Sequence, residues 1–268
     1  MADHENARTR TPESLIPALQ ASGFPFQTAV AAVVKASPGW TVAEVELPWK
    51  SDSGDNFLDL VGEHRSRCVI ATIECKKTEK DALVFLTPSD ARSVHDERMR
   101  GLYAHQIKDM TRRLELDCDE WLIDPTSPEA AFCVVSTTSS GKDQRLLERD
   151  VAQLVRATDA YADRRRVRFT PRQEPEPTRL FVPLLVTNAP LFVARYVAGE
   201  VPLDTGRVAI SHSDLSRVPW VRFRKAFTSY PGRDFGDRTA FVVTAENLSD
   251  FLSKLGTHIE GASSRGRA

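Results

Sequence analysis

The stretch Phe57–Lys77, FLDLVGEHRSRCVIATIECKK, decides the fold of this chain. Two apolar segments flank a polar turn, so the stretch predicts a hairpin of two strands. Charged residues interrupt both segments: Asp59 lies in the first, and Glu74 and Lys76 lie in the second. Charges are costly to bury without compensation, so these positions mark a candidate functional site.

The side chains of a strand alternate between its two faces. Glu74 and Lys76 therefore share one face of the second strand, together with Thr72. A turn centred on residues 65–66 would place Asp59 opposite Thr72 and diagonal to Glu74, about 7–8 Å away. This register would bring both carboxylates within reach of one ion.

Two carboxylates that face each other repel, and a divalent cation would compensate for this. Asp59 and Glu74 could hold Mg²⁺, or Mn²⁺ in its place, together with the backbone carbonyl of Cys75. Such an ion lowers the pKa of a bound water and stabilises charge on a phosphate oxygen. Lys76 could orient the attacking water or neutralise the developing charge. The alternative interpretation is a solvated strand end with a weak Glu–Lys ion pair.

The segments DNFLDLV (55–61) and VIATIECK (69–76), with the helix and strand before them, resemble the PD-(D/E)xK nuclease superfamily, which has the restriction-endonuclease-like fold. The resemblance covers about residues 20–140, in the order helix–strand–strand–strand–helix–strand. It implies an endonuclease that cleaves DNA, less often RNA, with Asp59 and Glu74 as metal ligands and Lys76 as the catalytic lysine. By analogy such a protein serves restriction, phage defence or repair.

The chain departs from the superfamily pattern at two positions. Many relatives carry a glutamate on the first core helix as an extra metal ligand, whereas this chain has Gln27 there. The proline that usually belongs to the motif is absent before Asp59. Gln27 and the low net charge favour an alternative function, a catalytically inactive nuclease-fold protein that serves as a nucleic-acid-binding or structural subunit. An unrelated α/β protein with a surface charge cluster is a third interpretation.

Other polar residues are accessory candidates for the site. Glu46 and Asp55 could each add a carboxylate, although a plain surface role is the simpler interpretation of both. Gln106 could reach the site from a helix predicted over 96–116. The run DRRRVR (163–168) is either a phosphate contact or a helix end whose charge suits the helix dipole. Candidate phosphate contacts are Lys77, Arg98, Arg100 and Lys108.

The apolar periodicity outside the hairpin predicts irregularly alternating helices and strands. Helices are predicted over 11–23, 25–37, 144–165 and 246–256. Strands are predicted over 41–49, 130–138, 180–189, 191–198 and 238–245, with 180–189 and 191–198 forming a pair. The segment 218–227 is either a short strand or the entry from a strand into a helix. This order predicts an α/β protein with a mixed central β-sheet flanked by helices.

We expect a single domain over residues 1–268, and the alternative is that the Pro/Glu-rich connector near 170–179 divides two domains. The resemblance places a restriction-endonuclease-like core at about 20–140. A C-terminal α/β extension over about 141–258 should pack on the same sheet, and residues 259–268 should form a disordered tail.

Composition narrows the class of protein. The 268 residues carry a net charge of −1, so any binding of nucleic acid must rest on local basic patches. The four cysteines form no CxxC pair and the six histidines are dispersed, which disfavours a zinc site. The start of the chain is polar, and its most apolar stretch is interrupted by proline and arginine. We expect a cytoplasmic protein with no membrane contact, nucleic acid (DNA first) as its partner, and a homodimer or a further protein partner.

Overall fold

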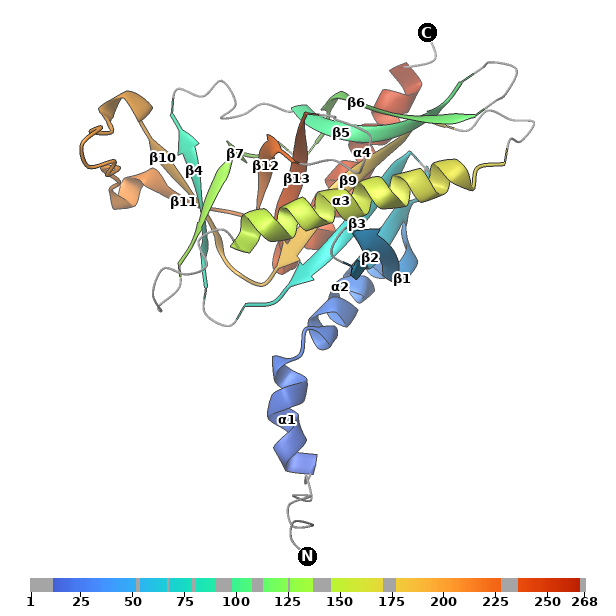
Figure 1. The fold of residues 1–268 in the computed structure, drawn as a ribbon, viewed down its shortest axis with the longest axis horizontal. Helices are drawn as coiled ribbons and strands as arrows, with labels where there is room; N and C mark the ends of the chain where they lie inside the picture. Colours follow the sequence, from blue (N-terminus) through green and yellow to red (C-terminus); the bar gives the residue numbers. More distant parts are fainter. Residues whose placement is uncertain are drawn as a thin grey trace, which may run out of the picture.

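The computed structural model describes residues 12–51, 54–66, 68–78, 81–89, 98–107, 113–124, 126–136, 146–170, 177–227 and 236–265. Within these segments the chain is a mixed α/β protein, with helices on both faces of a mixed sheet (Figure 1). This confirms the predicted class at that level. No helix in the described segments is long and apolar enough to cross a membrane.

The central sheet has nine strands, in the order β1–β2–β3–β9–β13–β12–β7, with β5 beside β9 and β6 beside β5. The strands are β1 (Trp40–Ser51), β2 (Gly54–His64), β3 (Val69–Lys76), β5 (Arg98–Gln106), β6 (Leu114–Leu122), β7 (Glu129–Ala130), β9 (Arg179–Thr187), β12 (Trp220–Ala226) and β13 (Asp237–Thr244). Strand β2 is antiparallel to both β1 and β3, whereas β3, β9 and β13 run parallel. The predicted hairpin is therefore present as β2 and β3.

Helices cover both faces of this sheet. Helix α3 (Leu146–Val167) crosses one face, and α2 (Phe24–Ala36) and α4 (Leu248–Arg265) pack on the other (Figure 1). Alternation along β3 explains this, because Ile70 packs in the cluster with α3 while Val69 packs in the cluster with α2 and α4. The N-terminal helix α1 (Pro12–Ala21) projects away from the sheet (Figure 1).

A second sheet of four strands lies beside the first, in the order β11–β10–β4–β8. Its strands are β4 (Leu83–Pro88), β8 (Phe132–Val135), β10 (Leu191–Tyr196) and β11 (Leu215–Val218). The ring of Phe85 in β4 packs edge-on against Phe223 in β12, with 6.1 Å between the ring centroids. Both rings belong to the apolar cluster that α3 covers. Short 3₁₀ turns occur at η1 (Ala198–Glu200), η2 (His212–Asp214) and η3 (Ala245–Asn247).

The helix predicted over 96–116 is wrong. Its described residues form the antiparallel strands β5 and β6. A glycine explains part of the error, because a Cβ at Gly101 would lie 2.8 Å from a methyl carbon of Leu180 in β9. Glycine weakens a helix, and within a strand it permits this close approach.

Three further predictions need correction. The segments 180–189 and 191–198 are strands but do not pair, because β9 lies between β3 and β13 while β10 pairs with β4 and β11. Strand β9 is apolar on both faces, as expected of a central strand. In the described residues five strands, β4 to β8, separate β3 from the next helix, α3, so the order helix–strand–strand–strand–helix–strand expected over about 20–140 is not present there. Helix α4 continues to Arg265, past the predicted start of a disordered tail.

Strand β9 changes partner along one edge. It pairs with β5 as far as Phe181 and with β13 from Leu184 onward. Pro183 lies at this change, where the loss of a backbone N–H is tolerated.

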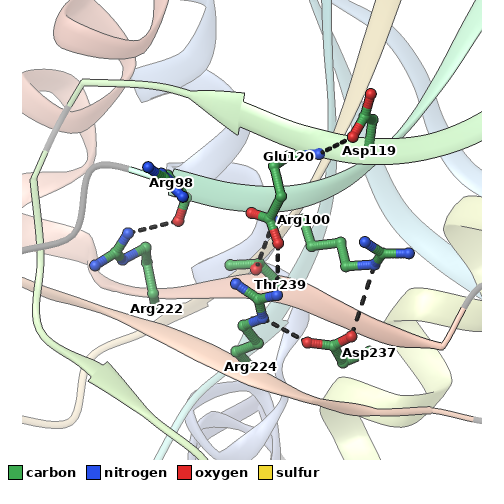
Figure 2. Close-up of polar contacts among 8 residues, drawn as sticks. All are labelled: Arg98, Arg100, Asp119, Glu120, Arg222, Arg224, Asp237 and Thr239. Atoms are coloured by element: carbon green, nitrogen blue, oxygen red, sulfur yellow. Dashed lines mark hydrogen bonds and ion pairs between the residues drawn. The ribbon is translucent and has the colours of Figure 1, made fainter. Parts of the chain in front are cut away.

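A polar network joins β5 and β13, the two strands that pair with β9 along this edge (Figure 2). The backbone N–H of Arg100 donates to the Thr239 hydroxyl, and the Arg100 guanidinium lies 3.6 Å from Asp237. Arg224 donates to Asp237 and to Glu120, each at 2.6 Å. These contacts tie the β5–β6 hairpin to β12 and β13.

Candidate active site at the end of strand β3

The register of β2 on β3 brings Asp59 closer to Glu74 than the sequence predicts. Leu60 lies opposite Ile73, so the same register continued by one residue places Asp59 beside Glu74 and not beside Thr72. The Asp59 carboxylate accepts a hydrogen bond of 2.7 Å from the backbone N–H of Cys75. Both acidic residues predicted as metal ligands therefore meet at the end of the hairpin.

Lys76 lies between two carboxylates from different elements. Its Nζ is 3.0 Å from Oε1 of Glu74 and 3.7 Å from Oδ1 of Asp150 on α3. Helix α3 is held to β3 nearby by a buried hydrogen bond of 2.6 Å between the hydroxyls of Thr72 and Thr158. Sequence reasoning missed Asp150, because its role depends on how α3 lies across the sheet.

Gln27 also reaches the site. Its amide nitrogen donates to the Glu46 carboxylate at 2.5 Å and to the backbone carbonyl of Asp59 at 3.2 Å. Glu46 has φ of +51°, the only positive φ of a non-glycine residue in the described segments. Such a conformation is strained for a residue with a side chain and often accompanies functional sites. The structure therefore brings both accessory candidates, Gln27 and Glu46, beside Asp59.

The carboxyl groups of the site have raised pKa values. The pKa of Glu74 is raised to about 7, first by burial and then by the charge of Asp59, and Lys76 offsets only part of this shift. Burial also raises the pKa of Asp59, with an added contribution from Glu46. The pKa of Asp150 is raised by burial as well. Negative charge in this cluster is thus incompletely compensated.

The two neighbouring groups on β3 behave differently. Burial alone lowers the pKa of Lys76, but Glu74 and Asp150 outweigh it, so the pKa is raised and the ammonium keeps its proton. Burial, followed by the charges of Asp59 and Glu74, raises the pKa of the Cys75 thiol, which therefore stays protonated. Lys76 can act as a fixed positive charge but not as a base, and Cys75 is not a thiolate nucleophile.

The donor set suits a hard cation. Mg²⁺ in proteins is commonly bound by one or two carboxylates and keeps several waters. Asp59 and Glu74 supply the carboxylates. The Cys75 carbonyl faces the same strand edge as the N–H that binds Asp59, because both groups of one strand residue point to one edge. No three or more His, Cys, Asp or Glu side chains of the described segments are grouped to hold a metal ion.

Two accessory candidates lie away from this cluster. Asp55 is exposed and pairs in register with Lys50 near the tip of the β1–β2 hairpin. Gln106 is the last residue of β5. Ala104, two residues before it, lies opposite Arg179 at the start of β9. Lys76 lies beside the far end of β9, so the structure does not bring Gln106 to the site.

The candidate phosphate contacts are spread over the molecule. Lys77 is exposed beside the site, and its ammonium donates to the backbone carbonyl of Gln20 in α1. The carbonyl of Arg98 accepts a hydrogen bond from the buried Arg222, and Arg100 belongs to the network with Asp237 (Figure 2). Lys108 lies outside the described residues. Of the candidates that the structure describes, only Lys77 is adjacent to the cluster.

Comparison with known proteins identifies no relative of this chain. No protein-family model, curated protein or solved structure matches the chain. The resemblance to PD-(D/E)xK nucleases therefore stays a prediction from the residues of the motif.

Proposed function

We propose that the chain is a metal-dependent nuclease that hydrolyses phosphodiester bonds of nucleic acid, with DNA as the first substrate to test. The observation that carries this proposal is the convergence of Asp59, Glu74 and Lys76 in one partly buried cluster at the end of β3. Perturbed carboxyl groups in such a cluster are typical of catalytic sites.

The order of elements supports the same function. Helix α2, strands β1 to β3, helix α3 and strand β9 occur in the order that the superfamily resemblance implies, with the five strands β4 to β8 inserted between β3 and α3. The three candidate residues lie on β2 and β3, and α2 contributes Gln27 at the position where many relatives have a glutamate. The parallel pairing of β3 with β9 places the cluster at the carboxyl end of both strands, a common location of sites in α/β proteins.

Each residue has a distinct role in this proposal. Asp59 and Glu74 would hold Mg²⁺, which when bound supplies an acidified water and neutralises charge on the phosphate. Lys76 keeps its proton and can donate it as a hydrogen bond to the negative phosphate oxygens in the transition state. Asp150 orients Lys76 from α3, and Gln27 holds Glu46 and the backbone at Asp59.

A cleavage assay tests this function. Single- and double-stranded DNA and RNA are incubated with Mg²⁺, Mn²⁺ or EDTA. Wild type is compared with Asp59→Asn, Glu74→Gln and Lys76→Met. We expect metal-dependent cutting that each substitution reduces by about 10²–10³-fold. Lys225→Met and Glu148→Gln are matched controls, because these residues form a similar ion pair of 2.9 Å elsewhere and should keep full activity.

Metal binding gives an independent readout. Addition of Mn²⁺ should raise the melting temperature of wild type, and Asp59→Asn and Glu74→Gln should abolish the increase. Cutting that survives all three site substitutions would contradict this site. If the protein neither cuts nucleic acid nor is stabilised by metal, the result would favour the inactive nucleic-acid-binding or structural subunit instead.

A further inference from the structure

A second site lies where α3 ends. A pocket of about 350 Å³ opens there between the end of α3 and the start of β9. Two of its arginines lie in the last turn of α3, one directly follows the end of this helix, and one begins β9. Its base is apolar, because Tyr161 and Phe181 line it and are almost completely buried. The arginines are Arg164, Arg165, Arg168 and Arg179.

This pocket is separate from the candidate active site. Arg164 follows Asp150 by fourteen residues on α3, which corresponds to about 21 Å along the helix axis. Strand β9 shows a similar separation. Arg179 begins this strand and Thr187, which pairs with Lys76, ends it, so these two residues lie about 26 Å apart. The pocket shares no lining residue with the cluster around Glu74.

One arginine of the pocket is held by the protein itself. The Arg165 guanidinium donates to the Glu63 carboxylate and, at 2.9 Å, to the Tyr161 hydroxyl. Its pKa is raised, because its interactions with Tyr161 and Glu63 outweigh the effect of burial. Arg165 is thus a fixed part of the wall.

The pocket carries an excess of positive charge. Among the described residues no ion pair joins Arg164 or Arg168 to a carboxylate, and Glu44 is the only acidic residue in the lining. The adjacent Arg166 differs, because it pairs with Asp163 at 2.7 Å and does not line the pocket. Like charges gathered in one concavity repel, and an anion bound between them would relieve this repulsion.

Compensation of the helix dipole accounts for only part of this arrangement. Basic residues in the last turn of a helix are stabilised by the helix dipole. That effect does not require an arginine from a different element, nor an apolar base beneath the guanidinium groups. Phe169 and Leu114 extend the apolar lining. A volume of about 350 Å³ is within the range of small-molecule sites.

We propose that this pocket binds a nucleoside phosphate group. Arg164 and Arg168 bind the phosphate oxygens with their planar guanidinium groups, which match phosphate geometry. The apolar base contacts the ring system attached to the phosphate. Such a group is supplied by a free nucleotide or by the 5′-phosphorylated end of a nucleic acid. The proposal is independent of the nuclease function, because it uses none of the residues around Lys76.

Calorimetric titration in EDTA, at about 0.15 M salt, tests the proposal. The probes are inorganic phosphate, nucleoside mono- and triphosphates, and an oligonucleotide with either a 5′-phosphate or a 5′-hydroxyl. Wild type is compared with the double variant Arg164→Ala/Arg168→Ala and with Arg166→Ala, which removes one positive charge two residues away from each of these arginines. Glu74→Gln is included and should bind like wild type.

We expect a nucleoside phosphate to bind wild type and Arg166→Ala alike, and the double alanine variant at least about tenfold more weakly. Arg164→Lys/Arg168→Lys keeps both charges but lacks the planar fork, so its affinity should be intermediate. If the alanine variant does not fold, the comparison of wild type with this conservative variant tests the proposal. Tighter binding of free nucleotides identifies them as the source, and a preference for the 5′-phosphorylated oligonucleotide identifies a nucleic-acid end.

Two results would overturn the proposal. One is the absence of binding by every phosphate probe at millimolar concentration. The other is an equal loss of affinity in Arg166→Ala and the double variant, which would show attraction by the general positive charge of this surface and no defined site.

Discussion

The carboxylate of Asp59 accepts a hydrogen bond of 2.7 Å from the backbone N–H of Cys75. This bond joins β2 to β3 just beyond the last ladder pair, Leu60 and Ile73. It fixes the position of one acidic residue of the site through the main chain of the residue next to Glu74. The hairpin itself therefore preorganises both carboxylates before any metal binds.

The hydrogen bond to Cys75 predicts a difference between two substitutions of Asp59. Asp59→Asn keeps an acceptor oxygen, whereas Asp59→Ala leaves the partly buried backbone N–H of Cys75 without an acceptor. We expect the alanine variant to be less stable than the asparagine variant by about 1–2 kcal/mol. Urea unfolding in EDTA measures this, with exposed Asp55 as the control position, where the same two substitutions should be equivalent. Equal stability of the two Asp59 variants would show that the bond does not fix the hairpin.

Glu74 predicts a pH dependence of stability in the metal-free protein. Its pKa is about 7 when folded, against an ordinary value of 4.5, so the folded state binds the extra proton between these values. The stability that this group contributes is therefore complete below about pH 4.5 and is lost as the pH rises through about 7.

We expect Glu74→Gln to remove this dependence. Between about pH 5 and pH 8, the free energy of unfolding of the variant should fall by about 1–3 kcal/mol less than that of wild type. Unfolding titrations at both pH values, in EDTA, make the comparison. Glu246→Gln is the control, because this side chain is 61% exposed. A pH profile of Glu74→Gln that matches wild type would refute the raised pKa.

Asp150 is expected to position Lys76. Because Asp150 helps to raise the pKa of Lys76, Asp150→Asn should lower that pKa and move the alkaline limb of the pH–rate profile to lower pH. We also expect about 10–100-fold less cleavage, the usual effect of losing a residue that orients a catalytic group. Asp150→Glu keeps the negative charge and should restore part of the cleavage activity and part of the raised pKa of Lys76. Asp163→Asn, on the same helix but paired with Arg166, should leave the profile unchanged.

The buried ion pair between Asp159 and Arg238 is expected to hold α3 to β13. Its atoms are 2.9 Å apart, and the side chains are only 3% and 1% exposed. Asp159→Asn removes the charge opposite a buried guanidinium and should cost about 3–5 kcal/mol of stability. The double variant Asp159→Leu/Arg238→Met should recover most of this loss.

The control for this pair is Arg217 with Glu246, which lie equally close but are 62% and 61% exposed. Glu246→Gln should change the free energy of unfolding by less than about 1 kcal/mol. Similar effects at the buried and the exposed pair would mean that burial does not set the strength of the interaction.

Much of the candidate site was predictable from local pattern. The apolar segments around the turn predict β2 and β3. Alternation along β3 places Glu74 and Lys76 on one face, and that is the face on which α3 packs. The apolar periodicity over 144–165 predicts α3 nearly to its observed bounds. These features depend on residues close together in the chain, so short-range periodicity determines them.

The tertiary structure decided which segments meet and in what register. A long apolar strand such as β9 shows that it is buried but not which strands flank it, and Gly101 acquires its meaning only from its contact with Leu180. The register of the hairpin differs by two residues from the one expected, and this difference brings Asp59 beside Glu74. Asp150 and the arginine pocket depend on the path of α3 across the sheet. That path follows from packing between residues far apart in the chain, which no local pattern encodes.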